Sequence, residues 1–225
     1  MANPPFSLSG LDRSNLREQA ALALRKAITT GDLPKGKHLV ETELSEALGI
    51  SRGTLREALR QLQQEAIVVA DNRGRLKVRH LDVREIFEIF EVRAALESLA
   101  AEIISRKSDR GRITELLREK VSALAAAHRK GLDASIETDL DFHRTMVHSA
   151  ENGALAHQWN SLEGSIRMCI MYSGVERAVR NMTPERHYDI VEAIETGDAA
   201  KAREAIFLHM SIAAETVGTA EASGQ

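Results

Sequence analysis

The chain has 225 residues, of which 43% are hydrophobic and 28% are charged, and its formal net charge is −3. This length can bury one large core or two modest ones, and no stretch approaches the ~18 consecutive apolar residues of a membrane span. Residues 1–10 lack a basic segment followed by an apolar one, so we expect a flexible leader there rather than a signal peptide. A single cysteine, Cys169, fits a buried thiol in the reducing cytoplasm.

The charge is divided unequally along the chain. Residues 1–80 contain 13 Lys and Arg against 9 Asp and Glu, a net charge of +4, whereas residues 81–225 contain 17 against 24, a net charge of −7. A basic segment suits a polyanion, because nucleic-acid phosphates supply most of the affinity that does not depend on sequence. The two parts are therefore expected to have different partners.

Three helices are predicted in the basic part, over 11–30 and as a pair within 39–65. Gly49 is placed to end the second helix, and Ser51 is placed as the N-cap of the third. Each helix has apolar residues at helical spacing, which predicts a buried stripe. These residues are Leu16, Ala20, Ala23, Leu24, Ala27 and Ile28 in the first helix, Leu44, Ala47 and Leu48 in the second, and Leu55, Ala58, Leu59 and Leu62 in the third.

Two short strands, 67–70 and 76–80, follow the third helix and are separated by the turn-forming sequence DNRGR. Three helices and a hairpin predict a winged helix-turn-helix over residues 11–80. Arg52, Arg56 and Arg60 recur every four residues on the third helix, as in a recognition helix, although a solvated charged face would show the same spacing. The hairpin carries Arg73, Arg75, Lys77 and Arg79, which would contact DNA phosphates or form an ordinary solvated surface.

Residues 11–80 resemble the DNA-binding domain of the GntR family of bacterial transcription regulators. The motif is LVETELSEALGISR at 39–52 and LREALR at 55–60, with turns at Gly31 and Gly36 before it and Arg73-Gly74 in the wing. Two positions depart from the family pattern: Gly53 replaces a hydroxyl or small side chain, and Ala66 lies in QEAI where Glu-Gly-Leu is usual. We expect Ala66 to alter only the entry into the hairpin. Together, the resemblance and the basic residues predict DNA contacts by Thr42, Ser51, Arg52, Gly53, Thr54, Arg56, Arg60, Arg73, Gly74 and Arg75.

From Val83 onward the sequence shows only helical periods, which predicts an all-α bundle of six helices over residues 81–217 and a flexible tail over 218–225. Asp198 is placed as an N-cap, and Thr183 precedes Pro184 at the first position of another helix. The predicted helices are 82–106, 109–130, 133–150, 153–174, 184–196 and 198–217.

Several polar residues fall on the inward faces of these helices. Asp139 and His143 are four residues apart and therefore share one face, while His187 and His209 lie on the apolar stripes of the last two helices. A single inward histidine is usually a hydrogen-bonded core residue. Three histidines and a carboxylate in one bundle are better explained by a divalent metal, with zinc favoured and nickel, iron or manganese as alternatives.

The second domain resembles the helical effector-binding FCD domain of the FadR-type branch of the GntR family. This resemblance implies that Asp139, His143, His187 and His209 are the metal ligands, leaving His128, His148 and His157 as surface or structural residues. It also implies that Arg93 holds the carboxylate of a small organic acid, whereas the residues alone would equally allow an ion pair between Arg93 and Glu97. Arg167 and Tyr172 are candidates to complete this effector pocket.

The sequence therefore predicts a homodimeric transcription regulator, mostly α-helical and not an enzyme, that binds a palindromic double-stranded DNA operator. Its DNA affinity would respond to a small carboxylate effector. The resemblance favours a repressor that the effector releases from DNA, with activation as the alternative. Two alternatives remain open: a metal-dependent hydrolase using the Asp and three His residues, and a non-specific architectural DNA-binding protein. The absence of an HExxH motif disfavours the hydrolase.

Overall fold

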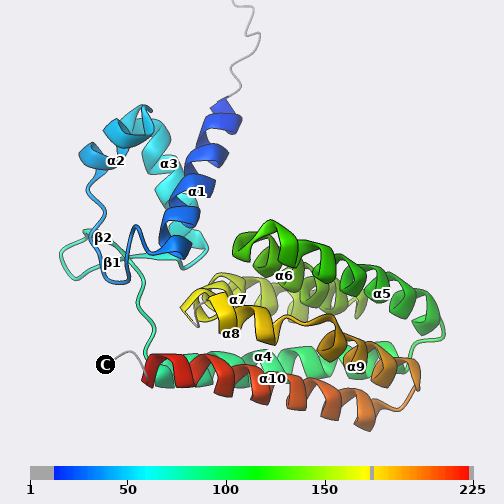
Figure 1. The fold of residues 1–225 in the computed structure, drawn as a ribbon. Helices are drawn as coiled ribbons and strands as arrows, with labels where there is room; N and C mark the ends of the chain where they lie inside the picture. Colours follow the sequence, from blue (N-terminus) through cyan, green and yellow to red (C-terminus); the bar gives the residue numbers. More distant parts are fainter. Residues whose placement is uncertain (1–12, 173–174, 223–225) are drawn as a thin grey trace, which may run out of the picture. The chain divides into compact units, whose positions relative to one another are not determined.

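The computed structural model describes residues 13–172 and 175–222, and the chain divides into two compact units. The winged unit comprises the described residues up to Gln64 together with Val68–Val78, and the helical unit comprises Glu65–Ile67 and the residues from Arg79 onward. The leader predicted over 1–10 lies outside the described residues. The elements are α1 (Arg13–Thr30), α2 (Glu41–Leu48), α3 (Arg52–Gln64), β1 (Val68–Ala70), β2 (Leu76–Val78), α4 (Val83–Ser105), α5 (Arg110–Ala127), a 3-10 turn (His128–Lys130), α6 (Leu132–Ser149), α7 (Gly153–Tyr172), α8 (Val175–Asn181), α9 (Pro184–Glu195) and α10 (Ala199–Ala222) (Figure 1).

The winged unit contains the predicted helix-turn-helix. Gly49 ends α2 in the left-handed conformation at φ 64°, and the Ser51 hydroxyl accepts a hydrogen bond of 3.1 Å from the Thr54 backbone N–H, which caps α3. All four apolar residues predicted on the inner stripe of α3 are buried, with at most 1% of their surface exposed. This burial fixes which face of α3 remains outside.

The buried stripes of the first two helices differ from the prediction. In α1 the core face is formed by Ala20, Ala21, Leu24 and Ile28, whereas Leu16 is 49% exposed. Ala23 in α1 and Ala47 in α2 are also exposed, so these three residues were wrongly assigned to the core. Alanine adds so little apolar area that a helix can rotate it outward at small cost, and periodicity alone places it poorly.

The wing is a two-stranded antiparallel hairpin in which Val68 pairs with Val78 and Ala70 with Leu76. In its loop the Asp71 carboxylate accepts hydrogen bonds from the backbone N–H groups of Arg73 and Arg75, at 2.8 and 2.9 Å. The segment before α2 extends the hairpin, since the Leu39 N–H donates to the Leu76 carbonyl at 2.8 Å. The hairpin is thus held to the helix-turn-helix by main-chain hydrogen bonds.

The helical unit contains all six predicted helices and one more, α8, in a segment for which no helix was expected. Its two longest helices, α4 and α10, lie side by side (Figure 1). Helix α4 starts with a capping box, in which Asp82 accepts from the Glu85 N–H at 2.7 Å. Helix α10 continues to Ala222, five residues beyond its predicted end at 217. None of the helices in the described part of the chain is long and apolar enough to cross a membrane.

Helix α7 contacts the two segments at which the chain enters the helical unit. A Cβ atom at Gly164 would lie 1.4 Å from the carbonyl oxygen of Glu65, the residue after α3, so only glycine permits this approach. The next residue, Ser165, accepts a 2.7 Å hydrogen bond from Arg79, the residue after β2. Both entry segments are therefore fixed on adjacent residues of one helix.

Ala66 has a positive φ of 54°, at the position where the family pattern usually has glycine. A left-handed conformation costs a non-glycine residue roughly 1 to 2 kcal/mol, part of which is offset because glycine has more freedom in the unfolded chain. We predict that Ala66→Gly raises the free energy of unfolding by about 1 kcal/mol, measured by urea denaturation. As a matched control, Ala95→Gly on the exposed face of α4 should lower it by about 1 kcal/mol. Equal destabilisation by both substitutions would contradict the strained turn.

Candidate functional site

Three histidine side chains from α6, α9 and α10 meet inside the helical unit. The rings of His143, His187 and His209 have centroids 4.8 to 5.3 Å apart, and one nitrogen of each lies within 4.8 Å of the others. These side chains are at most 6% exposed. His143 Nε2, His187 Nε2 and His209 Nδ1 have no hydrogen-bond partner among the described residues. Three buried ring nitrogens without hydrogen bonds therefore lie close together, and we call His143, His187 and His209 the histidine cluster.

Asp139 adds a carboxylate to the histidine cluster. Its Oδ1 atom lies 3.0 Å from His187 Nε2, and its Oδ2 atom lies 4.0 Å from His143 Nε2. The 3.0 Å approach lacks hydrogen-bond alignment, so the His187 nitrogen remains without a hydrogen bond despite the short distance. Burial opposes ionisation of Asp139, but its polar neighbours, Arg93 among them, lower its pKa to about 2. The structure thus brings together all four residues for which metal binding was predicted.

The outward-facing nitrogens of two of these histidines have acceptors that set their tautomers. His187 Nδ1 donates to the Thr183 carbonyl at 2.8 Å, and His143 Nδ1 lies 2.6 Å from a Glu97 carboxylate oxygen. Because both partners can only accept, the proton lies on Nδ1 and the Nε2 lone pair faces the cluster. The ring of Phe142 packs edge-on against His143 and His187, with centroids 5.0 and 4.9 Å away, which restricts their orientation.

The histidine cluster suits a divalent transition metal. Neutral imidazole nitrogens with a carboxylate oxygen are the donors that zinc, nickel, iron and manganese accept. Each buried nitrogen left without a hydrogen bond costs about 1 to 3 kcal/mol, and a shared cation removes this cost for all of them together. His143, His187, His209 and Asp139 would hold such an ion.

Arg93 on α4 lies close enough to affect Asp139 and His143 electrostatically, and only 2% of its surface is exposed. Its Nε donates to Glu97 at 2.7 Å, as in the ion pair that the sequence allowed, while its Nη2 has no hydrogen-bond partner in the described part of the chain. Both interpretations of Arg93 therefore apply in part, because the ion pair leaves one guanidinium nitrogen free for an anion.

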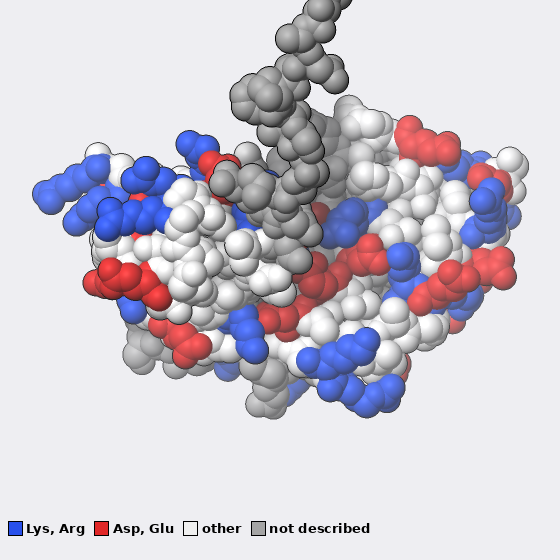
Figure 2. All heavy atoms as spheres, turned by 90° about the horizontal axis from the view of Figure 1, so that it is seen from above, with Lys and Arg blue, Asp and Glu red and all other residues white. Residues whose placement is uncertain are grey.

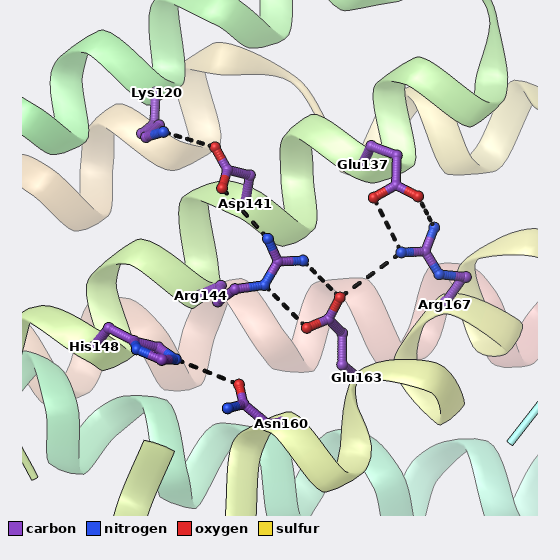
Figure 3. A network of polar contacts seen from close by, with 8 residues as sticks. All are labelled: Lys120, Glu137, Asp141, Arg144, His148, Asn160, Glu163 and Arg167. Atoms are coloured by element: carbon purple, nitrogen blue, oxygen red, sulfur yellow. Dashed lines mark hydrogen bonds and ion pairs between the residues drawn. The ribbon is translucent and has the colours of Figure 1, made fainter. Parts of the chain in front are cut away.

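The structure does not bring Arg167 to the histidine cluster. Arg167 forms a bidentate pair with Glu137, at 2.5 and 3.1 Å, and lies 3.7 Å from Glu163 (Figure 3). Glu137 is two residues before Asp139 on α6 and so projects from the opposite face of that helix. Arg144 and Lys120 continue this network through Asp141 and Glu163. Arg167 thus has acidic partners away from Arg93, and the Tyr172 side chain lies outside the described residues.

The three histidines that the resemblance left without a metal-binding role lie apart from the cluster. His148 and His157 are exposed, and His128 lies 3.1 Å from the Met182 carbonyl oxygen. Two residues next to the cluster were not predicted: Glu97 as an acceptor for His143, and Trp159, whose indole N–H donates to Glu97 at 2.9 Å. The sequence contained a signal for both residues. Glu97 follows Arg93 by one helical turn on an apolar face, which indicates a buried acceptor, and Trp159 is the only tryptophan in the chain.

The residues predicted to contact DNA lie mostly on the surface of the winged unit, where Lys and Arg side chains gather (Figure 2). On α3, Arg52 and Gly53 are exposed at the N-terminus, and Arg56 forms an exposed pair with Glu41 on α2 at 2.7 Å. The remaining predicted residues are exposed except Thr54, which is half-buried: Thr42, Ser51, Thr54, Arg60, Arg73, Gly74 and Arg75. Arg79 was expected to belong to the basic hairpin. It belongs instead to the helical unit, where its guanidinium lies 3.3 Å from the Glu85 carboxylate.

A winged helix-turn-helix and a helical domain with a buried polar site, present in one chain, define a DNA-binding transcription regulator with its own effector domain. The gntR family model of bacterial regulatory proteins matches residues 16–78, and the FCD domain model matches residues 88–211. The chain belongs to the GntR family, in the branch that carries an FCD domain, and this family consists of transcription regulators rather than enzymes.

Curated relatives are similar over most of the chain. A "probable D-xylose utilization operon transcriptional repressor" of Paenarthrobacter nicotinovorans is 29% identical over 217 residues, covering 95% of this chain and 93% of the relative. The gluconate operon transcriptional repressor of Bacillus licheniformis is 27% identical over 198 residues, covering 84% and 79%. The solved structure of McbR/YncC of E. coli has the same fold, with a TM-score of 0.64 and 19% identity over 93% of this chain and 99% of that one. These comparisons support neither the hydrolase nor the architectural-protein interpretation.

The buried histidines predict a pH-dependent stability for the metal-free protein. Burial lowers the pKa of His143 and lowers that of His209 well below the ordinary 6.5. Below pH 6.5 the unfolded chain therefore binds protons that the folded chain does not, so this contribution to stability is complete above pH 6.5 and is lost as the pH falls. We expect the free energy of unfolding to decrease between pH 6.5 and 5 by up to about 1.4 kcal/mol per pH unit for each such histidine.

Urea denaturation in the presence of a chelator measures this slope. His209→Gln should remove one histidine's share, whereas His157→Gln, which changes an exposed histidine, should leave the slope as it is. A stability that stays constant from pH 7 to pH 5 would contradict buried neutral histidines.

Proposed function

We propose that this chain is a cytoplasmic, homodimeric repressor whose operator affinity is controlled by a small organic acid bound at a metal-containing site in the helical unit. The observation that carries the proposal is the set of buried polar atoms without partners. Three ring nitrogens of the histidine cluster and Nη2 of Arg93 are all unpaired among the described residues. A metal with an attached carboxylate would satisfy both groups, the metal through the histidines and the carboxylate through the guanidinium.

The proposed effector class follows from the charges around the cluster. Asp139 alone does not neutralise a divalent ion, and Glu97 is already paired with Arg93. An anionic ligand therefore fits better than a neutral one, and a carboxylate can bridge a metal and a guanidinium. The gluconate operon repressor among the relatives is named for the operon of a sugar acid, which is consistent with this class. Zinc is the proposed metal, with nickel, iron or manganese as alternatives.

The proposed output is DNA binding by the winged unit. Ser51, Arg52, Gly53 and Thr54 at the start of α3 would contact the major groove, and the hairpin loop would contact flanking phosphates. The other proposed contacts are Thr42, Arg56, Arg60, Arg73, Gly74 and Arg75. Two copies of the chain would occupy half-sites about 34 Å apart, or one helical turn.

The proposed control is thermodynamic linkage between the two ligands. If the acid binds one arrangement of the dimer more tightly and DNA binds another, each ligand must weaken the binding of the other by the same factor. Coupling of this kind typically amounts to about 1 to 3 kcal/mol, or 5- to 150-fold in affinity. The acid would then relieve repression without touching the DNA-binding residues.

The recognition helix can be tested with an operator selected from random DNA duplexes by the wild-type protein. We predict that Arg52→Ala and Arg56→Ala each weaken specific binding by about 1 to 3 kcal/mol while leaving zinc content and the melting temperature unchanged. Arg84→Ala is the matched control, because Arg84 is a highly exposed arginine on α4. Fluorescence anisotropy with excess competitor DNA gives the affinities. Wild-type affinity in both α3 variants would refute the assignment of the recognition helix.

The effector site can be tested by thermal shift with zinc-loaded and chelated protein and a panel of organic acids that includes gluconate. A ligand present at 100 times its Kd should stabilise the folded state by about 2.7 kcal/mol. We predict that His187→Ala abolishes the responses to zinc and to acids, and that Arg93→Lys retains the zinc response but loses the acid response. His148→Ala should resemble the wild type, since His148 is an exposed histidine on α6. An acid response that persists in His187→Ala would place the effector elsewhere.

A further inference from the structure

We propose that Glu97 is a positioning residue for the histidine cluster, which holds His143 in its metal-binding tautomer and ties this ligand to Arg93 and Trp159. The inference rests on the proposed metal site and extends it to a residue that would not touch the metal. It assigns the buried carboxylate a role beyond neutralising Arg93.

The Glu97 carboxylate accepts from donors on three helices. Oε1 accepts hydrogen bonds from Arg93 Nε on α4 at 2.7 Å and from Trp159 Nε1 on α7 at 2.9 Å. Oε2 accepts a hydrogen bond from His143 Nδ1 on α6 at 2.6 Å. Glu97 and His143 have no exposed side-chain surface, so water does not compete for these bonds. One carboxylate oxygen is thus reserved for the histidine, and the other joins α4 to α7.

This geometry determines how His143 faces the cluster. A carboxylate that accepts at Nδ1 keeps the proton there, so the Nε2 lone pair is directed at the point where His187 Nε2 and His209 Nδ1 also converge. A carboxylate behind the ring also makes the imidazole a stronger donor to a metal. Glu97 would therefore raise metal affinity through orientation and basicity together.

The shared oxygen connects the metal ligand with the proposed anion site. An anion that binds Nη2 of Arg93 would compete with Glu97 for the positive charge of the guanidinium, and Glu97 would pass the change to His143 through its other oxygen. Trp159 bonds to the same oxygen as Arg93, and it is the only tryptophan in the chain. Its fluorescence therefore reports on this carboxylate in the intact protein.

A purely structural role makes different predictions. If Glu97 only compensates the charge of Arg93, a folded variant at position 97 should keep the same His143 tautomer and the same metal affinity. Zinc affinity and the imidazole 15N chemical shifts of His143 therefore distinguish the two roles, because neither depends on stability alone.

The experiment compares full-length wild type with Glu97→Gln by zinc competition against a chelator, by Trp159 fluorescence and by 15N NMR of the histidines. We expect Glu97→Gln to bind zinc 10- to 100-fold more weakly, to show a mixture of His143 tautomers and to lose the fluorescence change on zinc binding. Glu137→Gln is the matched control, since Glu137 pairs with Arg167 on the outer face of α6 and should behave as wild type.

Each outcome decides the proposal. A folded Glu97→Gln protein with unchanged zinc affinity and unchanged tautomer overturns the role of Glu97 and leaves the metal site standing, whereas a wild type that binds no zinc removes both. Loss of Glu97 leaves the Arg93 charge buried without a partner, so this variant can unfold. The wild-type spectrum decides in that case: an apo His143 protonated on Nδ1 supports the proposal, and one protonated on Nε2 overturns it.

Discussion

The interior of the helical unit contains ionised side chains that water does not reach, so other groups in the protein must compensate their charges. Glu97, Arg93 and Asp139 are all nearly inaccessible, and each would cost several kcal/mol to bury alone. Burial alone would raise the pKa of Glu97, but His143 and Arg93 lower it to about 2, so the carboxylate is charged throughout the neutral range. The charge of Glu97 is compensated by Arg93 on the same helix, and His143 of α6 and Trp159 of α7 donate further hydrogen bonds to it.

The features predictable from sequence were those set by local spacing. The buried stripe of α3 follows from helical period, and so does the shared face of Asp139 and His143, because neighbours one turn apart must project together. The pairs Arg167–Glu137, Arg79–Ser165, Glu97–His143 and Glu97–Trp159 join residues that are 30 to 86 positions apart. Local periodicity says nothing about such partners, and it also failed for α8, which has only seven residues and too few turns to show a stripe.

The two units use charge in opposite ways. In the winged unit, Arg56 and Arg60 of α3 are exposed and form ion pairs with acids on the surface, so a phosphate can replace these partners at little cost. In the helical unit the polar groups are buried and held in fixed positions. A ligand that forms hydrogen bonds or ion pairs with them therefore gains more binding free energy than the same contacts would give in water.

Gly164 and Ser165 give helix α7 a mechanical position in this scheme. The chain leaving the recognition helix touches α7 at Gly164, and the chain leaving the wing is hydrogen-bonded to it at Ser165. Five residues before Gly164, Trp159 of the same helix donates a hydrogen bond to Glu97. Helix α7 therefore contacts Glu97, Glu65 and Arg79 within one short segment, so a displacement of this helix along its axis would break the contacts of Glu65 and Arg79 unless both residues moved with it.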